Sequence, residues 1–114
     1  MHIGQDCKFI IVLTNLPDRE SARDLAEYLL DVRLAACVNV LAPCLSMYHW
    51  QGKIETADEV PVLIKALAAN YAALEQAIRG KHPYEVPEIV ALPVVAGYAG
   101  YLDWLASVSR TETE

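Results

Sequence analysis

The sequence is poor in cysteine, in positive charge and in long apolar runs, and each shortage excludes a class of protein. Its three cysteines form no CxxC pair, which excludes a disulfide framework and a cysteine-based zinc site. No apolar run approaches the roughly 18 residues that a membrane-spanning helix needs. Nine basic residues stand against 15 acidic ones, a net charge of −6, which repels phosphate backbones and anionic lipids. We therefore expect neither nucleic acid nor a membrane as partner.

Apolar residues, in contrast, are abundant. They make up 54% of the 114 residues, more than the ~45–50% of an ordinary soluble domain. The length predicts one domain over residues 1–114, and a domain of this size exposes much of its surface. The surplus apolar residues are most simply placed between subunits, which predicts a homo-oligomer. The N-terminal residues do not resemble a secretory signal, so we expect a cytoplasmic protein.

The apolar patterns predict the element order strand, helix, strand, strand, helix, strand, and then a short helix. This order indicates a ferredoxin-like α+β sandwich, in which an antiparallel sheet carries both main helices on one face. The other face also carries apolar residues, which again predicts an oligomer. The second and third strands form an unusually long hairpin, bent near Pro43. We expect strands at 9–13, 36–50, 53–67 and 89–95, helices capped by Asp18 and Asn70, the second helix ending at Gly80, and a frayed tail from Ser107 onward.

The long hairpin has aromatic residues next to its turn. A two-residue turn at 51–52 places Trp50 opposite Lys53 and Tyr48 opposite Glu55,. Two interpretations remain open. The aromatics form either a packing ladder across the two strands or a contact for another subunit, since Trp and Tyr are enriched in interface cores.

The stretch 81–89 is the one segment that suggests chemistry. It places His82 and Glu88 six residues apart, with Pro83 and Pro87 between them. The two prolines fix φ and remove two backbone donors, so the segment is a stiff connection and not a helix interior. From the residues alone, a solvated or packed loop histidine is the simpler interpretation, and a metal-ligand pair is the alternative.

Four ordered motifs resemble those of the CutA family of divalent-cation tolerance proteins, over nearly the whole chain. They are the segments 34–39, 48–55, 82–89 and 101–105, which read LAACVN, YHWQGKIE, HPYEVPEI and YLDWL. The resemblance implies a ferredoxin-like protomer assembled as a homotrimer, similar in architecture to the PII-type signalling proteins. It also implies a hairpin that reaches a neighbour and open sheet faces that are buried together. The implied function is divalent-metal tolerance with copper(II) binding and no enzymatic reaction.

The resemblance also implies metal ligands, and this sequence departs from them at one position. The family ligands are a cysteine ending the first strand, a histidine before Pro-Tyr and a glutamate after the second proline. They fall here on Thr14, His82 and Glu88. A threonine hydroxyl is a poor copper ligand, so the implied site consists of His82, Glu88 and water, with Cu(II) the first metal and Zn(II) the second. A neighbouring subunit could supply further ligands.

The sequence leaves two other functions open. The first is a PII-like regulatory or assembly module that binds a small anion or a protein partner at subunit clefts, although no glycine-rich phosphate loop is present. Its candidate anion contacts are Lys53, Lys65, Arg79 and Lys81. The second is an enzyme that uses Tyr84 and Glu85 beside His82 for proton transfer. We predict that the protein is not an enzyme, because no nucleophile has a histidine and an acid at a recognisable spacing.

Overall fold

The computed structural model describes residues 7–111. The N-terminal segment 1–6, used above to predict the location, and residues 112–114 of the tail lie outside the described residues. The elements, in chain order, are β1 (Phe9–Leu16), α1 (Arg19–Asp31), β2 (Cys37–Val40), β3 (Cys44–Trp50), β4 (Lys53–Leu67), η1 (Ala68–Asn70), α2 (Tyr71–Lys81), β5 (Val90–Pro93) and α3 (Ala99–Val108).

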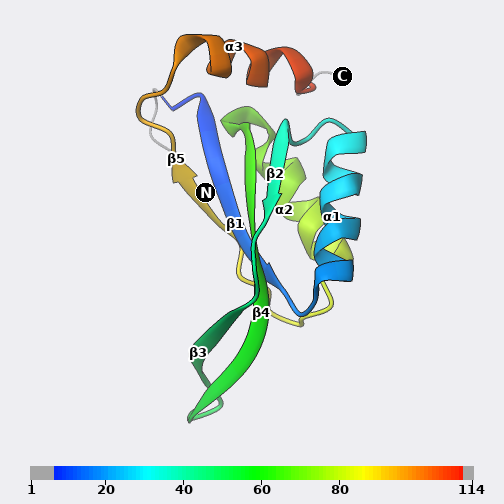
Figure 1. Ribbon diagram of the computed structural model, residues 1–114, viewed down its shortest axis with the longest axis vertical. Helices are drawn as coiled ribbons and strands as arrows, with labels where there is room; N and C mark the ends of the chain where they lie inside the picture. The colour runs from blue at the N-terminus through cyan, green and yellow to red at the C-terminus, as the bar shows by residue number, and fades with distance from the viewer. Residues whose placement is uncertain (1–6, 112–114) are drawn as a thin grey trace.

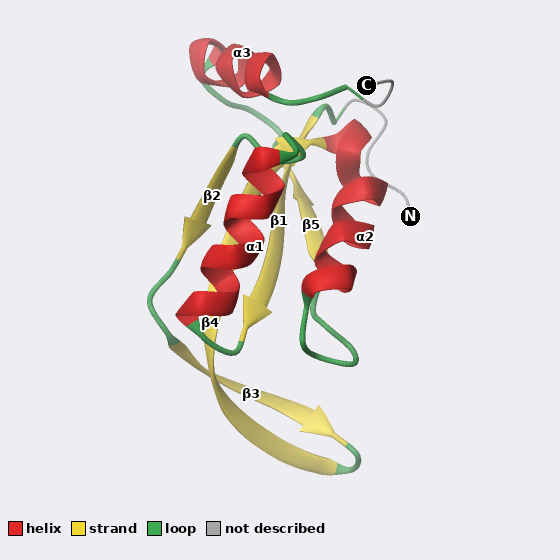
Figure 2. Cartoon of the chain, turned by 90° about the vertical axis from the view of Figure 1, so that its right-hand side faces the viewer, coloured by secondary structure: helices red, strands yellow, loops and turns green. Residues whose placement is uncertain are grey.

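The strands form an antiparallel sheet in the order β2-β4-β1-β5, and β3 pairs with the outer half of β4. Helices α1 and α2 lie side by side on one face of the sheet (Figure 2). The β3–β4 hairpin projects beyond the sheet, and α3 crosses its opposite end (Figure 1). The molecule is 43 Å long along its main axis. The predicted ferredoxin-like α+β fold, with a long hairpin and a short C-terminal helix, is confirmed. No helix within residues 7–111 has the length and apolarity to cross a membrane.

The core lies between the sheet and the two helices. Successive residues of β1 alternate between half-buried and buried, as expected when one face of a strand packs and the other does not,. Each fully buried aliphatic side chain contributes about 1.5–3 kcal/mol to folding. The largest such side chains are Ile10, Val12, Leu16, Leu25, Leu29, Val62, Ile64, Leu74 and Ile78.

Both main helices begin after the predicted cap residues, but only α1 has a side-chain capping bond. The Oδ1 atom of Asp18 accepts a hydrogen bond from the Ser21 backbone N–H at 2.7 Å, which caps the first turn,. Asn70 makes no capping bond; its Nδ2 donates to the Arg110 carbonyl at 2.9 Å instead. Gly80 lies inside α2, because the helix ends where Pro83 forces the preceding residue into an extended conformation,.

The hairpin differs from the prediction in one respect. The single strand expected at 36–50 is broken into β2 and β3, because Pro43 has no N–H to donate to the ladder,. The turn is the expected two-residue one: Gln51 (φ 51°) and Gly52 (φ 79°) both have positive φ, which matches the twist of the strands,. The predicted pairs of Trp50 with Lys53 and of Tyr48 with Glu55 are confirmed. The strand predicted at 89–95 is shorter and spans Val90–Pro93.

Helix α3 packs against the end of the sheet, and hydrogen bonds hold it there. Leu105 is 3% exposed and packs with Ala36 and Leu67. The Arg110 N–H donates to the Arg33 carbonyl at 2.9 Å, and the Arg33 Nε donates to the Val108 carbonyl at 3.1 Å. The prediction of a frayed tail from Ser107 is therefore wrong for residues 107–110, because α3 extends to Val108 and hydrogen bonds to Arg33, just after α1, hold Val108 and Arg110.

The sheet face opposite α1 and α2 is largely apolar, although it carries Lys65 beside Ile11, and α3 packs against one end of it. On this face Ile11 pairs with Leu92, and Leu13 lies between Leu63 and Val90. The residues of β1 and β4 on this face are half-buried, whereas in β5 Val90 is 45% and Leu92 is 53% exposed. We call these five residues the open face. Exposed apolar surface of this kind is typical of an interface.

Candidate functional site

His82 is the residue that follows the last turn of α2, and its side chain is buried. The extended backbone that Pro83 imposes turns the chain away from the helix, and the imidazole, 8% exposed, reaches the end of β1. Its Nε2 lies 2.6 Å from the Asn15 carbonyl oxygen, and its Nδ1 lies 3.2 Å from the Tyr84 backbone N. The carbonyl can only accept and the N–H can only donate. The ring is therefore the neutral tautomer with its proton on Nε2.

Both nitrogens of His82 are thus used within the chain. Burial lowers the pKa of His82 below its ordinary value of 6.5, against the opposing effects of the Asn15 carbonyl and the negative charge of Glu59,. Binding a metal through either nitrogen requires one of the two hydrogen bonds to be released. In this arrangement the histidine connects the 82–89 loop to β1.

Asn15 joins the two predicted ligands. Its backbone carbonyl accepts from His82, and its side-chain Nδ2 donates to the Glu88 Oε1 at 3.0 Å. The loop therefore folds back so that both of its ends meet the end of β1. Glu88 itself is exposed, which leaves its second oxygen accessible.

Thr14 faces the core and not the loop. It is fully buried, on the same side of β1 as Val12 and Leu16, and its hydroxyl oxygen has no hydrogen-bond partner. A side chain at position 14 could therefore bind a metal ion only if the ion lay inside the core. Within residues 7–111 no three His, Cys, Asp or Glu side chains are grouped as a metal site. The metal pair of His82 and Glu88 stays a prediction that needs a further ligand.

The unpaired hydroxyl of Thr14 predicts a stabilising substitution. Thr14→Val replaces the hydroxyl by a methyl group of similar shape and removes the cost of burying an unsatisfied donor, about 1–3 kcal/mol. We expect the free energy of unfolding, measured with urea, to rise by about 1 kcal/mol. The control is Thr56→Val on the exposed part of the hairpin, where we expect no gain. A loss of stability in Thr14→Val would contradict the assignment.

A cleft of about 690 Å³ opens between the hairpin and the 82–89 loop. We call it the hairpin cleft. Figure 2 shows the hairpin curving beneath the loop that follows α2. The cleft is lined by Asn15, residues 46–50 of β3, Glu59 of β4 and residues 84–88.

Glu59 and Tyr84 form the inner wall of the hairpin cleft. Glu59 is 8% exposed, and the Tyr84 hydroxyl bonds to its carboxylate. Burial, reinforced by this carboxylate, raises the pKa of Tyr84 to about 12, so the phenol keeps its proton at neutral pH and does not act as a base,. The Tyr84 ring lies 4.7 Å from the His82 ring, centroid to centroid.

Sequence reasoning missed Asn15 and Glu59. The partners of Asn15 lie 67 and 73 residues away, and no local pattern indicates them. Glu59 is buried where the hairpin and the 82–89 loop come together, and the local sequence does not indicate this. Among the described residues no lysine or arginine lines the cleft, so one chain by itself does not bring the predicted anion contacts together there. Lys81 instead lies over the Tyr28 ring at 4.5 Å, and Lys65 over the Tyr101 ring at 5.9 Å.

Comparison with known proteins gives consistent matches. The family described as CutA1 divalent ion tolerance protein matches residues 10–108. The divalent-cation tolerance protein CutA of Pectobacterium atrosepticum is 42% identical over 104 residues, which cover 91% of this chain and 94% of the relative. The structure of the divalent cation tolerance protein Cut A1 from Thermus thermophilus superposes with a TM-score of 0.87 at 40% identity, covering 90% of this chain and 99% of that one. For CutA1 from Shewanella sp. SIB1 the TM-score is 0.89 at 36% identity, with coverage of 92% and 98%.

Proposed function

This chain belongs to the CutA1 family of divalent ion tolerance proteins, and from this premise we propose that it acts in metal tolerance as a homotrimer that binds a divalent cation. The role in metal tolerance is supported by the family match over residues 10–108. We propose Cu(II) as the first metal and Zn(II) as the second, because imidazole and carboxylate ligands suit both. We place this function in the cytoplasm, which fractionation of the source cells would test.

The open face supports the proposed trimer. Its five residues are all aliphatic and lie on β4, β1 and the edge strand β5, on the side that α1 and α2 leave bare (Figure 2). Burying apolar surface of this kind between subunits stabilises an oligomer by about 25 cal/mol per Å² removed from water. Association through the sheets also accounts for the high apolar content of the sequence.

His82 and Glu88 are the residues that we propose to hold the metal. Their common contact with Asn15 places them at one corner of the molecule. Glu88 offers a free oxygen, but the imidazole must give up one of its hydrogen bonds, and two protein ligands are fewer than the usual three or four. The third ligand would come from water or from another subunit. A metal held there would bind the 82–89 loop more firmly to β1.

Calorimetric titration tests this site. We expect saturable Cu(II) binding to the purified protein and an affinity at least about tenfold lower in Glu88→Gln, because a carboxylate ligand is replaced by a weaker amide. Glu85→Gln is the matched control, since it removes the same charge from an exposed residue of the same loop. Equal affinities in the protein and in Glu88→Gln would exclude Glu88 as a ligand. Zn(II) is titrated in parallel, with weaker binding expected.

The alternative function is a PII-like assembly module. The exposed aromatics of the hairpin, Tyr48 and Trp50, favour docking on a protein,. The acidic lining of the hairpin cleft favours no anion. In either form we propose that the protein works by binding and not by catalysis, in keeping with the protonated state of Tyr84.

A further inference from the structure

We propose that the hairpin cleft is a binding site for an organic ammonium ion, held by the Glu59 carboxylate and the aromatic rings of Tyr48, Trp50 and Tyr84. This inference goes beyond the proposed metal-tolerance function and does not depend on it. It rests on the charge of the cleft, on the burial of Glu59 and on the face of the hairpin that carries the aromatic rings.

The lining of the cleft is predominantly acidic. Among the described residues it includes Glu59, Glu85 and Glu88, one histidine, His49, and no lysine or arginine. Glu59 is the informative member, because it is more than nine-tenths buried. Buried carboxylates normally have a cationic partner. Within residues 7–111 the one ion pair is Arg23 with Glu27, on the surface of α1.

Glu59 interacts in the cleft with a hydroxyl group. The Tyr84 phenol bonds to the carboxylate. A single hydroxyl leaves most of the acceptor capacity of a carboxylate unused. Glu59 therefore lines the cleft as a negative group that lacks a counter-charge.

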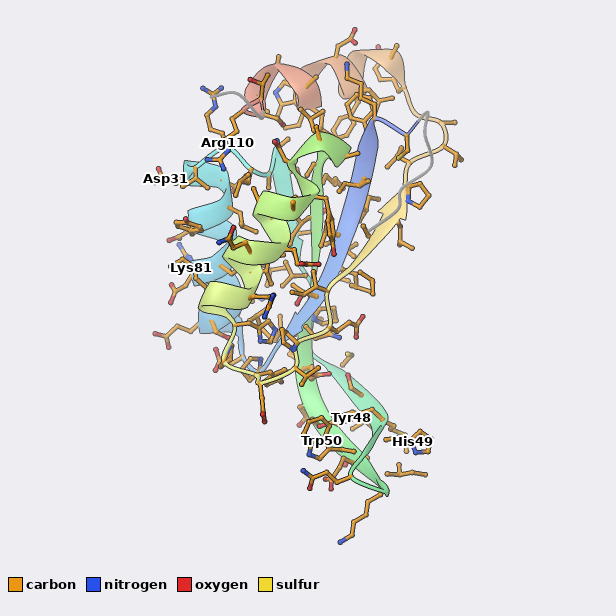
Figure 3. The ribbon with its side chains drawn as sticks, turned by 180° about the vertical axis from the view of Figure 1, so that it is seen from behind. Asp31, Tyr48, His49, Trp50, Lys81 and Arg110 are labelled. Carbon is orange, nitrogen blue, oxygen red and sulfur yellow. The ribbon has the colours of Figure 1, made fainter. Side chains whose placement is uncertain are left out.

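The strand register places Glu59 and the aromatics on the same face of the hairpin. Glu59 pairs with Cys44, and Tyr48 and Trp50 follow four and six residues later along β3, so all have the same parity,. His49 has the opposite parity, and Figure 3 shows it pointing to the other side of the hairpin from Trp50. The face that carries Glu59 meets Tyr84 of the loop across the cleft.

The size and chemistry of the cleft fit an organic cation. About 690 Å³ lies within the range of small-molecule sites, ~300–1,000 Å³,. An alkylated ammonium group is attracted to aromatic faces by ~0.5–2 kcal/mol per ring and needs no lone pair from the protein. A bare metal ion would need several converging ligands, and no such group of three exists within residues 7–111. An anion would be repelled by the carboxylates.

Choline and its uncharged carbon analogue 3,3-dimethylbutan-1-ol are the probes that test the proposal. The two have nearly the same shape, so a difference in binding measures the contribution of the positive charge. Binding to the full chain is followed by calorimetry in buffer with EDTA, which removes metal ions. We expect saturable binding of choline and binding at least about tenfold weaker for the alcohol, equivalent to ~1.4 kcal/mol.

Two variants and a control test whether choline binds in the hairpin cleft. Glu59→Gln removes the charge but keeps an oxygen that can accept from Tyr84, and Trp50→Leu removes an aromatic face from an exposed position. We expect each to weaken choline binding at least about tenfold, by the loss of a charge or of a cation–π contact. Asp58→Asn is the control, because Asp58 is the exposed residue immediately before Glu59 in β4 and its side chain lies on the opposite face. It should leave the affinity within twofold.

Several results would overturn the proposal. They are the absence of saturable choline binding, equal binding of the alcohol, or an Asp58→Asn effect as large as that of Glu59→Gln. Thermal unfolding of each variant shows that it is folded; if Glu59→Gln is not, Trp50→Leu decides. The proposed function is tested separately by Cu(II) titration and by oligomer mass, so either can fail without the other.

Discussion

Leu92→Glu is expected to abolish the proposed trimer. Leu92 lies on the open face, opposite Ile11, and is 53% exposed in the single chain. A glutamate is easily solvated there in a monomer, whereas in a trimer three carboxylates would be buried within one interface. The effective cost of burying an unpaired ion is several kcal/mol. This cost is paid once for every subunit and exceeds what the lost leucine contacts contribute.

Light scattering after size-exclusion chromatography measures the effect. The protein itself should have three times the chain mass of 12.6 kDa, and Leu92→Glu should have the chain mass or should unfold once its subunits separate. Leu30→Glu is the matched control, because Leu30 is 42% exposed on the outer surface of α1. It should keep the trimer. A trimeric Leu92→Glu would show that the open face is not the interface.

His82→Ala is expected to destabilise the fold by about 2–4 kcal/mol. The substitution leaves the Asn15 carbonyl and the Tyr84 N–H without their partner and creates a cavity in a buried position. Urea unfolding at pH 7.5 measures the loss. His49→Ala removes the same side chain from an exposed position of the hairpin, and there we expect a change within about 0.5 kcal/mol. Similar losses in both variants would refute the structural role of His82.

The contribution of His82 should also depend on pH. Burial holds the pKa of His82 below its ordinary 6.5 in the folded protein, so the unfolded chain binds more protons as the pH falls below that value,. The contribution is therefore complete above about pH 6.5 and decreases as the pH falls through the folded pKa. We expect the stability difference between the protein and His82→Ala to be smaller at pH 5 than at pH 7.5. A difference that grows toward pH 5 would mean that the imidazole is charged in the fold.

Local features of the fold were predictable because their causes lie close together in the sequence. The cap of α1 by Asp18 needs only Ser21, three residues away. The two-residue turn at 51–52 fixes the register of the whole hairpin, and so the pairs of Tyr48 and Trp50. The errors at Asn70 and in the C-terminal tail arose where a second, more distant contact decided the outcome. Asn70 has the chemistry of a cap, but its amide binds the Arg110 carbonyl 40 residues away.

The candidate site was only half predictable for the same reason. The prolines around His82 and Glu88 predict a stiff loop, and the resemblance to the CutA family selected these two residues. Neither indicates that the imidazole would be bonded at both nitrogens, or that Asn15 would join the two ends of the loop. The alternation of β1 places Thr14 on the buried side, but its unpaired hydroxyl is seen only once the core is assembled.

The sequence alone therefore determined the order of the elements, the hairpin turn, the apolar surplus that indicates an oligomer, and the family. Each of these follows from short-range stereochemistry, from composition or from ordered motifs. The tertiary structure alone decided that His82 is buried and neutral, that Thr14 faces the core, and that Glu59 lines a cleft without a counter-charge. The physical reason is that burial and electrostatic environment depend on which distant segments pack together. For His82 the decisive packing is that of the loop after α2 against the end of β1, and for Glu59 it is that of the hairpin against the same loop.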